Sequence, residues 1–264
     1  MTFEVQNGCF GYRGAREILH NINMRVEKGE VLSILGPNGV GKTTLLKCTL
    51  GFLKWRKGQT LIDGKPANSF HPQELWKRVG YVPQAKRVAF SYEVEEMVLL
   101  GRNAHLGLLT QPGTEDKRIA RECLQMIGME KLRGKLCNEI SGGEMQMVLV
   151  ARALAADPEI LILDEPESNL DFKNQLIVLD TITELCRKRN ISAIVNTHYP
   201  EHALSISDKA LVLNPDGSSL FGQAREVITE QRLQKAFDVE VAIRDFLVGE
   251  RNFTCVMPTG VYSA

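Results

Sequence analysis

Residues 31–44 read VLSILGPNGVGKTT, an apolar β-type run that enters a glycine-rich turn and then a helical run. The turn, Gly36-Pro37-Asn38-Gly39-Val40-Gly41-Lys42-Thr43-Thr44, fits the pattern GxxxxGK[ST]. Glycine lets backbone N–H groups approach a phosphate closely, and a helix that begins at Gly41 or Lys42 directs its positive end toward the same anion. Because the match lies between a strand and a helix, it predicts a loop that binds ATP or GTP.

Two side chains of this loop have a predicted chemical role. Lys42 would neutralise the β- and γ-phosphates, and the Thr43 hydroxyl would ligate Mg²⁺. The alternative is a glycine-rich turn that precedes a helix by chance, and the strand in front of the turn disfavours it. The loop alone does not distinguish transporters from kinases, motors or G proteins.

A second candidate group is a pair of acids, Asp164-Glu165, directly after the apolar run Ile160–Leu163. A strand buried on both faces brings such acids to the carboxyl end of a sheet, where α/β proteins bind ligands. We expect Asp164 to hold Mg²⁺ through water and Glu165 to orient and deprotonate the attacking water. Two solvated acids are the ordinary alternative, and the phosphate loop upstream favours the catalytic interpretation.

The composition describes an ordinary soluble enzyme of one large domain, or of one core with an inserted subdomain. Of 264 residues, 44% are apolar and 24% charged, and 32 basic residues balance 32 acidic ones, which argues weakly against a nucleic-acid binder. The six cysteines form no CxxC pair and are typical of core residues in a reducing compartment. No signal peptide and no apolar run of membrane-spanning length is present, so we expect any membrane role to need a partner.

Strand and helix patterns alternate on both sides of a helical block, which predicts an α/β core with a helical insertion. The strand-like runs are Phe3–Val5, Ile18–Val26, Val31–Leu35, Gln59–Gly64, Val79–Val82, Ile160–Leu163, Ser192–Asn196 and Lys209–Leu213. The helical runs are Lys42–Leu50, Val94–Leu100, Lys117–Ile127, Gly142–Ala155 and Asn174–Lys188. Residues 252–264 show no assignable pattern, and we expect a loosely packed end there.

Ser141-Gly142-Gly143-Glu144-Met145-Gln146 resembles the LSGGQ-type signature of ABC (ATP-binding cassette) ATPases, and it precedes Asp164 by 23 residues, as in that family. A serine and two glycines at a helix N-terminus form a second anion-binding cradle, although the motif alone is more typical of a plain helix cap. The resemblance implies two subunits arranged head to tail. Each ATP would then lie between the Lys42 loop of one subunit and the Ser141 loop of the other.

The remaining family motifs follow in order. Tyr12 resembles the aromatic residue that stacks on adenine, and Gln84 resembles the Q-loop glutamine that contacts Mg²⁺ and the lytic water. Ser168-Asn169-Leu170-Asp171 resembles the D-loop, which touches the partner's site, and His198 resembles the switch histidine, which bonds the γ-phosphate and holds Glu165 and the water in line. With ATP and Mg²⁺ as cofactors, the implied site comprises Glu165, His198 and Gln84 as catalytic groups; Tyr12, Gly36, Pro37, Asn38, Gly39, Val40, Gly41, Lys42, Thr43, Thr44, Ser141, Gly142, Gly143 and Asp171 around the nucleotide; and Thr43, Gln84 and Asp164 around the metal.

The resemblance covers roughly residues 3–222 and implies a P-loop NTPase (RecA-like) α/β core with an antiparallel β-subdomain and an inserted α-helical subdomain. The core would comprise residues 1–84 and 159–222. Residues 85–158 would form the helical subdomain with the signature and a groove for a helix of the permease, and residues 223–264 a C-terminal extension. The sequence departs from the family pattern at Met145 and Met147, where arginines are frequent, and at Glu167, where threonine is frequent.

One branch of the family matches further. Phe90-Ser91-Tyr92-Glu93-Val94, the run Val98–Arg102 and His105 are similar to the helical subdomain of importers for ferric siderophores, haem and cobalamin, a group with a few oxyanion members. The run Gly222–Ile228, followed by Leu233, Phe237 and Val239, is similar to that group's C-terminal end. The alternative is that these are helix-core residues without bearing on the cargo, which the ATPase subunit does not touch.

This branch implies an ATPase subunit on the cytoplasmic face of the cell membrane, peripheral to it. It would act as a homodimer with polytopic permease subunits and, indirectly, with an extracytoplasmic substrate-binding protein, and without nucleic acid. The alternatives are a non-transport ABC ATPase that acts on DNA or ribosomes, and the ATPase of an exporter.

Overall fold

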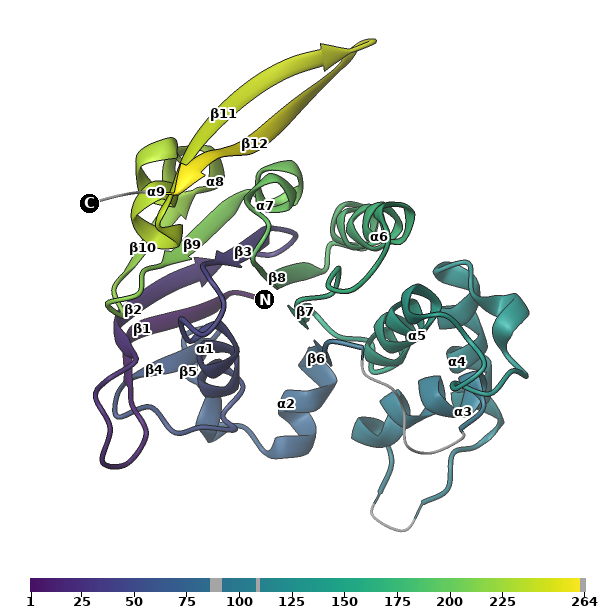
Figure 1. Cartoon of the computed structure of the whole chain (residues 1–264). Helices are drawn as coiled ribbons and strands as arrows, with labels where there is room; N and C mark the ends of the chain where they lie inside the picture. The colour runs from purple at the N-terminus through teal and green to yellow at the C-terminus, as the bar shows by residue number, and fades with distance from the viewer. Residues whose placement is uncertain (86–91, 108–109, 262–264) are drawn as a thin grey trace. The chain divides into compact units, whose positions relative to one another are not determined.

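The computed structural model describes residues 1–85, 92–107 and 110–261, with the backbone alone at residue 251. Its contacts divide the chain into unit 1, Met1–Ser69 with Ile194–Ala264, and unit 2, Phe70–Ala193. The boundary crosses β8 (Ser192–Thr197), and the elements of both units are labelled in Figure 1. None of the helices in the described ranges is long and apolar enough to cross a membrane.

Unit 1 contains the predicted antiparallel β-subdomain. The order is β2-β1-β4-β5, with β1 (Phe3–Phe10), β2 (Leu19–Val26), β4 (Lys57–Ile62) and β5 (Lys65–Pro66). β1 is longer than the expected Phe3–Val5. Its register against β2 shifts between Val5 and Gly8, where Asn7 has a φ of 50°, and such a bulge interrupts the alternation by which a strand is recognised in sequence.

A second group of strands in unit 1 has the order β10-β9-β3-β8, and the phosphate loop directly follows β3. β3 (Val31–Leu35) is buried at every residue and parallel to β9 (Lys209–Leu213), and β10 (Ser219–Gln223) is antiparallel to β9. Burial on both faces accounts for the continuous apolar run of β3. The same unit holds α1 (Lys42–Thr49), the 3₁₀ turn η1 (Ala67–Ser69) and α7 (Pro200–Ile206).

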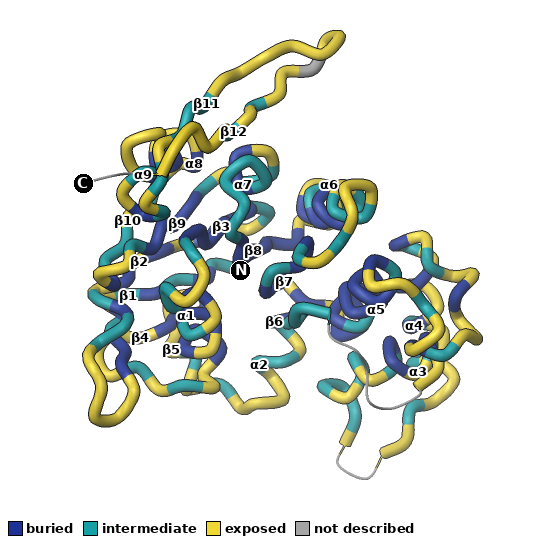
Figure 2. Tube along the Cα trace, viewed as in Figure 1, coloured by how far each residue is buried: buried dark blue, intermediate teal, exposed yellow. Residues whose placement is uncertain are grey.

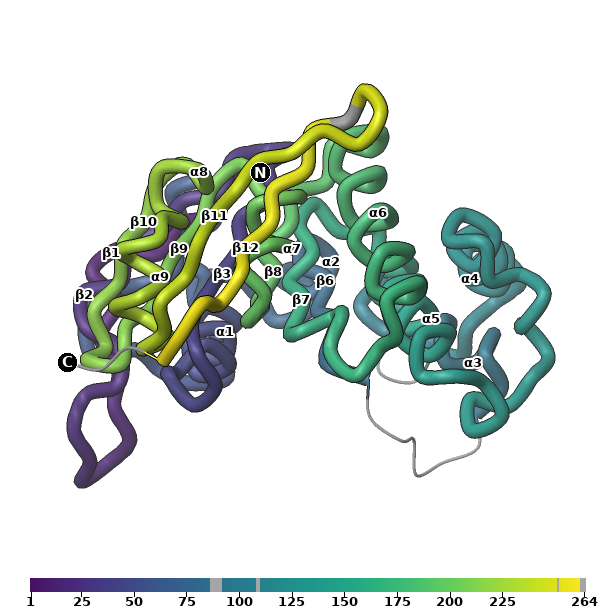
Figure 3. The backbone as a smooth tube through the Cα atoms, turned by 45° about the horizontal axis from the view of Figure 1, so that its top comes forward, coloured from purple at the N-terminus to yellow at the C-terminus, as the bar shows by residue number. Residues whose placement is uncertain are grey.

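The C-terminal part of unit 1 corrects one expectation. After α8 (Ala224–Val227) and α9 (Glu230–Phe237), the chain forms a hairpin of β11 (Val239–Val248) and β12 (Arg251–Val261), so the expected loose end is wrong for residues 252–261. Ile243 and Val256 pack against the core cluster that contains Leu233, whereas Leu247 near the turn is 72% exposed. The far part of the hairpin is exposed (Figure 2), and β11 and β12 lie side by side up to the turn (Figure 3). Pro258 and Gly260 obscure the strand pattern in the sequence.

Unit 2 contains the predicted helical insertion between two parallel strands, β6 (Val79–Val82) and β7 (Ile160–Asp164). Buried apolar side chains, among them Val98, Leu124 and Val148, join α3, α4 and α5. The helical elements of this unit are α2 (Pro72–Arg78), α3 (Val94–Leu99), η2 (Leu100–His105), α4 (Thr114–Met126), η3 (Glu130–Leu132), α5 (Gly142–Leu154) and α6 (Phe172–Arg189). The contact units divide the chain after Ser69 and after Ala193. They do not test the predicted domain boundaries near residues 84, 158 and 222, which stay predictions.

Candidate functional site

The phosphate loop lies in unit 1 and is closed around its lysine. The Lys42 side chain is buried, and its Nζ donates hydrogen bonds to the carbonyl oxygens of Gly36 at 2.9 Å and Pro37 at 3.1 Å. Gly41 has a φ of 111°, and a Cβ on it would lie 2.8 Å from Ile18 Cγ2. Both the backbone conformation and the lack of space therefore require glycine there. The loop thus places a cation and the first N–H groups of α1 together, which fits a polyphosphate.

Tyr12 and His198 also belong to unit 1. The Tyr12 ring is 48% exposed and packs by its edge on Phe10, with centroids 5.2 Å apart, while its carbonyl accepts a 2.6 Å hydrogen bond from Arg56 Nη2. An exposed ring on an anchored backbone is suited to stacking on a base. His198 directly follows the buried strand β8, and its ring lies 4.1 Å from that of Tyr199.

In unit 2, the predicted metal carboxylate ends β7 in buried surroundings. Asp164 is 9% exposed, and its Oδ2 accepts a 3.5 Å hydrogen bond from the Tyr81 hydroxyl, which comes from the adjacent strand β6. Burial, together with the charge of Asp164, raises the pKa of Tyr81 to about 12, so the phenol remains a hydrogen-bond donor at neutral pH. Sequence reasoning assigned Tyr81 no role, because a single tyrosine in a strand has no distinguishing pattern.

Glu165 is held in an uncommon backbone conformation, with φ of 50°. Its Oε2 accepts a 3.0 Å hydrogen bond from Ser168 Oγ, and its carbonyl accepts one from the Ser168 backbone N–H at 3.1 Å. Non-glycine residues in this region cluster at active sites, where surrounding contacts hold them. Asp171, at the end of the same D-loop-like segment, caps α6 by accepting a hydrogen bond from Asn174 N at 2.8 Å.

The signature-like segment forms a complete helix cap. Ser141 Oγ accepts a 3.3 Å hydrogen bond from Glu144 N, and the Glu144 carboxylate accepts one from Ser141 N at 2.8 Å, which holds the pKa of Glu144 below its usual range. Gly143 is buried, and a Cβ there would lie 2.5 Å from the Asn174 side chain of α6. The cap is therefore present, and its further role as a cradle for a partner's nucleotide stays a prediction.

Gln84 is tied to the signature helix through its neighbour. The backbone N–H of Ala85 donates a 2.9 Å hydrogen bond to Gln146 Oε1, and Gln146, on α5, is 1% exposed. Sequence reasoning named Gln146 only as part of the motif. Phe90 and Ser91 of the importer-like stretch lie outside the described residues.

The three departures from the family pattern are all buried. Met145 and Met147 of α5 are 6% and 2% exposed, and Glu167 is fully buried. The methionines therefore pack in the core of unit 2, at positions where arginines would place charged groups.

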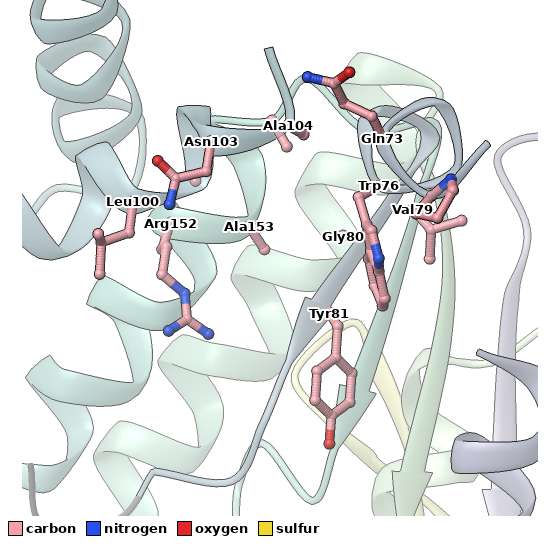
Figure 4. A pocket seen from close by; sticks show the side chains of 13 residues that line it. Gln73, Trp76, Val79, Gly80, Tyr81, Leu100, Asn103, Ala104, Arg152 and Ala153 are labelled. Carbon is pink, nitrogen blue, oxygen red and sulfur yellow. The ribbon is translucent and has the colours of Figure 1, made fainter. Parts of the chain in front are cut away.

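The same unit holds a groove with a volume of about 460 Å³ between α2, β6, η2 and α5 (Figure 4). Arg102 Nη1 and His105 Nε2 hydrogen-bond the carbonyl oxygens of Ala155 and Ala156 after α5, each at 2.8 Å, so much of the importer-like run Val98–His105 forms one fixed wall. The groove is lined by Pro72, Gln73, Trp76, Val79, Gly80, Tyr81, Leu100, Gly101, Asn103, Ala104, Arg152, Ala153 and Ala156.

The predicted metal ligands are a hydroxyl, an amide oxygen and one carboxylate, which suits Mg²⁺ carried mainly by nucleotide phosphates. Thr43 lies in unit 1, whereas Gln84 and Asp164 lie in unit 2. Each unit positions its own motif residues. The nucleotide and metal site that the motifs of both units would form together stays a prediction.

Comparisons with known proteins identify the family. The family described as ABC transporter matches residues 19–168. An uncharacterised ABC transporter ATP-binding protein of Methanocaldococcus jannaschii is 40% identical over 98% of this chain and 99% of its own length. A molybdate import ATP-binding protein of Haemophilus influenzae is 32% identical over 97% and 96% of the two chains. A Helicobacter pylori protein provisionally assigned to iron chelatin transport is 38% identical over 81% and 86%.

Solved structures agree on the fold. A proposed metal-chelate type ABC transporter in an inward-facing conformation has a TM-score of 0.88 at 30% identity and covers 98% of this chain and 97% of its own. A dimeric ATP-binding cassette bound to ADP and Pi has a TM-score of 0.72 at 27% identity, covering 84% and 99%. On these likenesses, together with the phosphate loop and the acids after β7, the chain belongs to the ABC transporter family, as an ATP-binding subunit with the ABC ATPase fold.

Proposed function

We propose that this chain hydrolyses ATP to energise import of a metal chelate such as a ferric siderophore, haem or cobalamin. The observation that carries the hydrolytic role is Glu165, held by Ser168 directly after the buried Asp164. The cargo class is supported by the iron chelatin relative and the metal-chelate type transporter structure. The molybdate relative supports an oxyanion as a second candidate cargo.

In this proposal each residue has one task. Tyr12 stacks on adenine, and the loop Gly36–Thr44 surrounds the phosphates with N–H groups and the Lys42 ammonium. Thr43, Gln84 and Asp164 would hold Mg²⁺, which supplies neutralisation of the phosphate charge. Glu165 accepts a proton from the attacking water, and His198 keeps that water in line with the γ-phosphate.

The proposed assembly is a head-to-tail homodimer, in which Ser141, Gly142, Gly143 and Asp171 of one copy complete the site of the other. Dimeric cassettes among the solved relatives support the pairing. The dimer would lie on the cytoplasmic face of the membrane, attached to polytopic permease subunits that a substrate-binding protein outside the membrane supplies with cargo. The groove of unit 2 would receive a cytoplasmic segment of the permease.

The variant Glu165→Gln tests the hydrolytic role. Removing a general base lowers turnover by about 10²- to 10⁴-fold, while the amide preserves shape and therefore ATP binding. Phosphate release and the binding of a fluorescent ATP analogue measure the two quantities. Glu184→Gln, on the exposed side of α6, is the matched control and should retain turnover. Unchanged turnover in Glu165→Gln would contradict the assignment of the base.

A further inference from the structure

A buried glutamine of the signature helix holds the backbone next to the predicted metal ligand Gln84. Gln146 of α5 is 1% exposed, and its Oε1 accepts a 2.9 Å hydrogen bond from the backbone N–H of Ala85. Its neighbours Met145 and Met147 are buried as well. Glutamine is mostly exposed in folded proteins, so an amide among apolar side chains needs a physical reason.

Stability does not explain this amide. Gln146 Nε2 is buried, and among the residues that the structure describes it has no hydrogen-bond acceptor. A buried donor without an acceptor loses its bond to water, which offsets the stabilisation from the bond that Oε1 makes. Methionine or leucine would fill a similar volume without that cost. The advantage of glutamine at this position therefore lies in what Oε1 holds.

The bond falls where the sheet stops holding the chain. The pairing of β6 with β7 ends at Val82 and Leu163, two residues before Gln84. The N–H of Ala85 is a hydrogen-bond anchor on the far side of Gln84. The Gln84 backbone thus lies between two fixed points, the last strand pair and the Gln146 amide. Anchors on both sides of a residue limit the positions that its side chain can reach.

We propose that Gln146 is a positioning residue for ATP hydrolysis. Its amide oxygen holds the Ala85 peptide and thereby places the Gln84 side chain for Mg²⁺ and the attacking water. This role rests on the function proposed above, which gives Gln84 those contacts, and adds the residue that sets where Gln84 stands. The role requires no contact between Gln146 and the nucleotide.

Hydrogen exchange of the Ala85 amide tests the bond. Gln146→Met keeps the volume and removes the acceptor, so exchange at Ala85 should become at least about tenfold faster, because the amide is opened to water. Mass spectrometry of peptides from the full-length chain in deuterated buffer measures the rate. Leu149→Met, at a residue 5% exposed on the same helix, is the matched control and should leave the rate unaltered. An unaltered rate in Gln146→Met would overturn the proposal.

Turnover and magnesium dependence test the positioning. Because a small misplacement near the reaction costs up to about a hundredfold in rate, we expect Gln146→Met to lower kcat by about ten- to a hundredfold. It should also raise the Mg²⁺ concentration for half-maximal hydrolysis, whereas binding of a fluorescent ATP analogue should stay within about twofold of native. Leu149→Met should retain kcat. An unaltered kcat and Mg²⁺ dependence in Gln146→Met would contradict the role.

Folding is checked on the same samples. The urea midpoint of unfolding shows whether Gln146→Met is folded. If it is not, Gln146→Leu, the other apolar change of similar volume, is measured in its place, with the same expected losses.

A double-variant cycle shows whether Gln146 acts through Gln84. Gln84→Ala removes the side chain that is positioned, so adding Gln146→Met to it should lower kcat further by less than about twofold. A full further loss in the double variant would mean that Gln146 acts by general disruption, which overturns the proposal. If Gln84→Ala leaves too little turnover to measure, the affinity of the ATP-bound chain for Mn²⁺, followed by electron paramagnetic resonance, replaces kcat in the same comparison.

The outcomes separate this role from the proposed function. If Gln84→Ala alone leaves kcat and the Mg²⁺ dependence unaltered, the metal contact of Gln84 in the proposed function is wrong, and the role of Gln146 is wrong with it. If Gln84→Ala lowers kcat and Gln146→Met does not, the positioning role alone is wrong.

Discussion

At the scale of the residue, the groups expected to carry the chemistry are each held by a neighbour. Lys42 is held by the carbonyls of its own loop, Glu165 by Ser168, and Asp164 by Tyr81. The contact of Lys42 lies within the loop motif itself, so the sequence indicates it. The Tyr81 contact arises because β6 and β7 are parallel neighbours, paired from Val79 with Ile160 onward, and pairing of distant strands has no local signature in a sequence.

Tyr81→Phe removes the hydroxyl and keeps the ring in the groove. Because one long hydrogen bond to a carboxylate is worth about 0.5–1.5 kcal/mol, we expect the Mg²⁺ concentration for half-maximal ATP hydrolysis to change by about two- to tenfold. A Mg²⁺ titration of phosphate release measures it. Tyr92→Phe, at a residue 38% exposed, is the control. An identical Mg²⁺ dependence in Tyr81→Phe would show that Tyr81 does not act on the metal site.

At the scale of the element, the contact between α5 and α6 depends on one glycine. A Cβ at Gly143 would lie 2.5 Å from Asn174 Cγ, whereas one at Gly142 would meet only Leu170 Cδ2 at 3.9 Å. Glycine is unfavourable within helices, so its presence at the tight position reflects packing rather than propensity. The sequence indicates the glycine pair, and only the packed helices show which member is required for close approach.

Gly143→Ala should therefore lower the free energy of unfolding by about 1–3 kcal/mol through overpacking. Gly142→Ala should be neutral or slightly stabilising, since alanine favours a helix and meets no clash. Urea denaturation of both variants gives the comparison. Asn174→Ala combined with Gly143→Ala should recover part of the loss, because it removes the contacts of Cγ and Oδ1 at 2.5 and 2.7 Å and leaves Asn174 Cβ at 2.9 Å. No recovery at all would mean that the strain lies elsewhere.

The C-terminal hairpin provides a second element-scale prediction. Ile243 packs on the cluster around Leu233, and Leu247, four residues further along β11, is 72% exposed. Ile243→Ala should lower the free energy of unfolding by about 1–2 kcal/mol, part of the cost of a fully buried site, whereas Leu247→Ala should change it by less than about 0.5 kcal/mol. Thermal unfolding measures both, and equal effects would show that the base of the hairpin is not packed in solution.

At the scale of the whole molecule, the proposed head-to-tail dimer can be tested by complementation. Lys42→Ala removes the phosphate cation, and Ser141→Arg blocks the predicted second cradle. In a dimer of the two variants, one site combines both lesions and the other is intact. Each variant alone should be inactive in ATP hydrolysis, and an equal mixture should recover about a quarter of native activity, if half the dimers are mixed and each has one working site of two. An inactive mixture would contradict sites shared between copies.

What the sequence determined by itself is local. The phosphate loop, the acids after β7 and the signature-like cap are short runs whose chemistry depends on neighbours along the chain, and β3, β6 and β9 have the predicted bounds because continuous apolar runs indicate fully buried strands. Tertiary structure alone decided the rest. The Tyr81–Asp164 bond, the glycine at the α5–α6 contact, the fixed wall of the groove and the C-terminal hairpin all depend on residues that are remote in sequence or half exposed. Such contacts are set by packing and strand register, which leave no periodic trace in the order of amino acids.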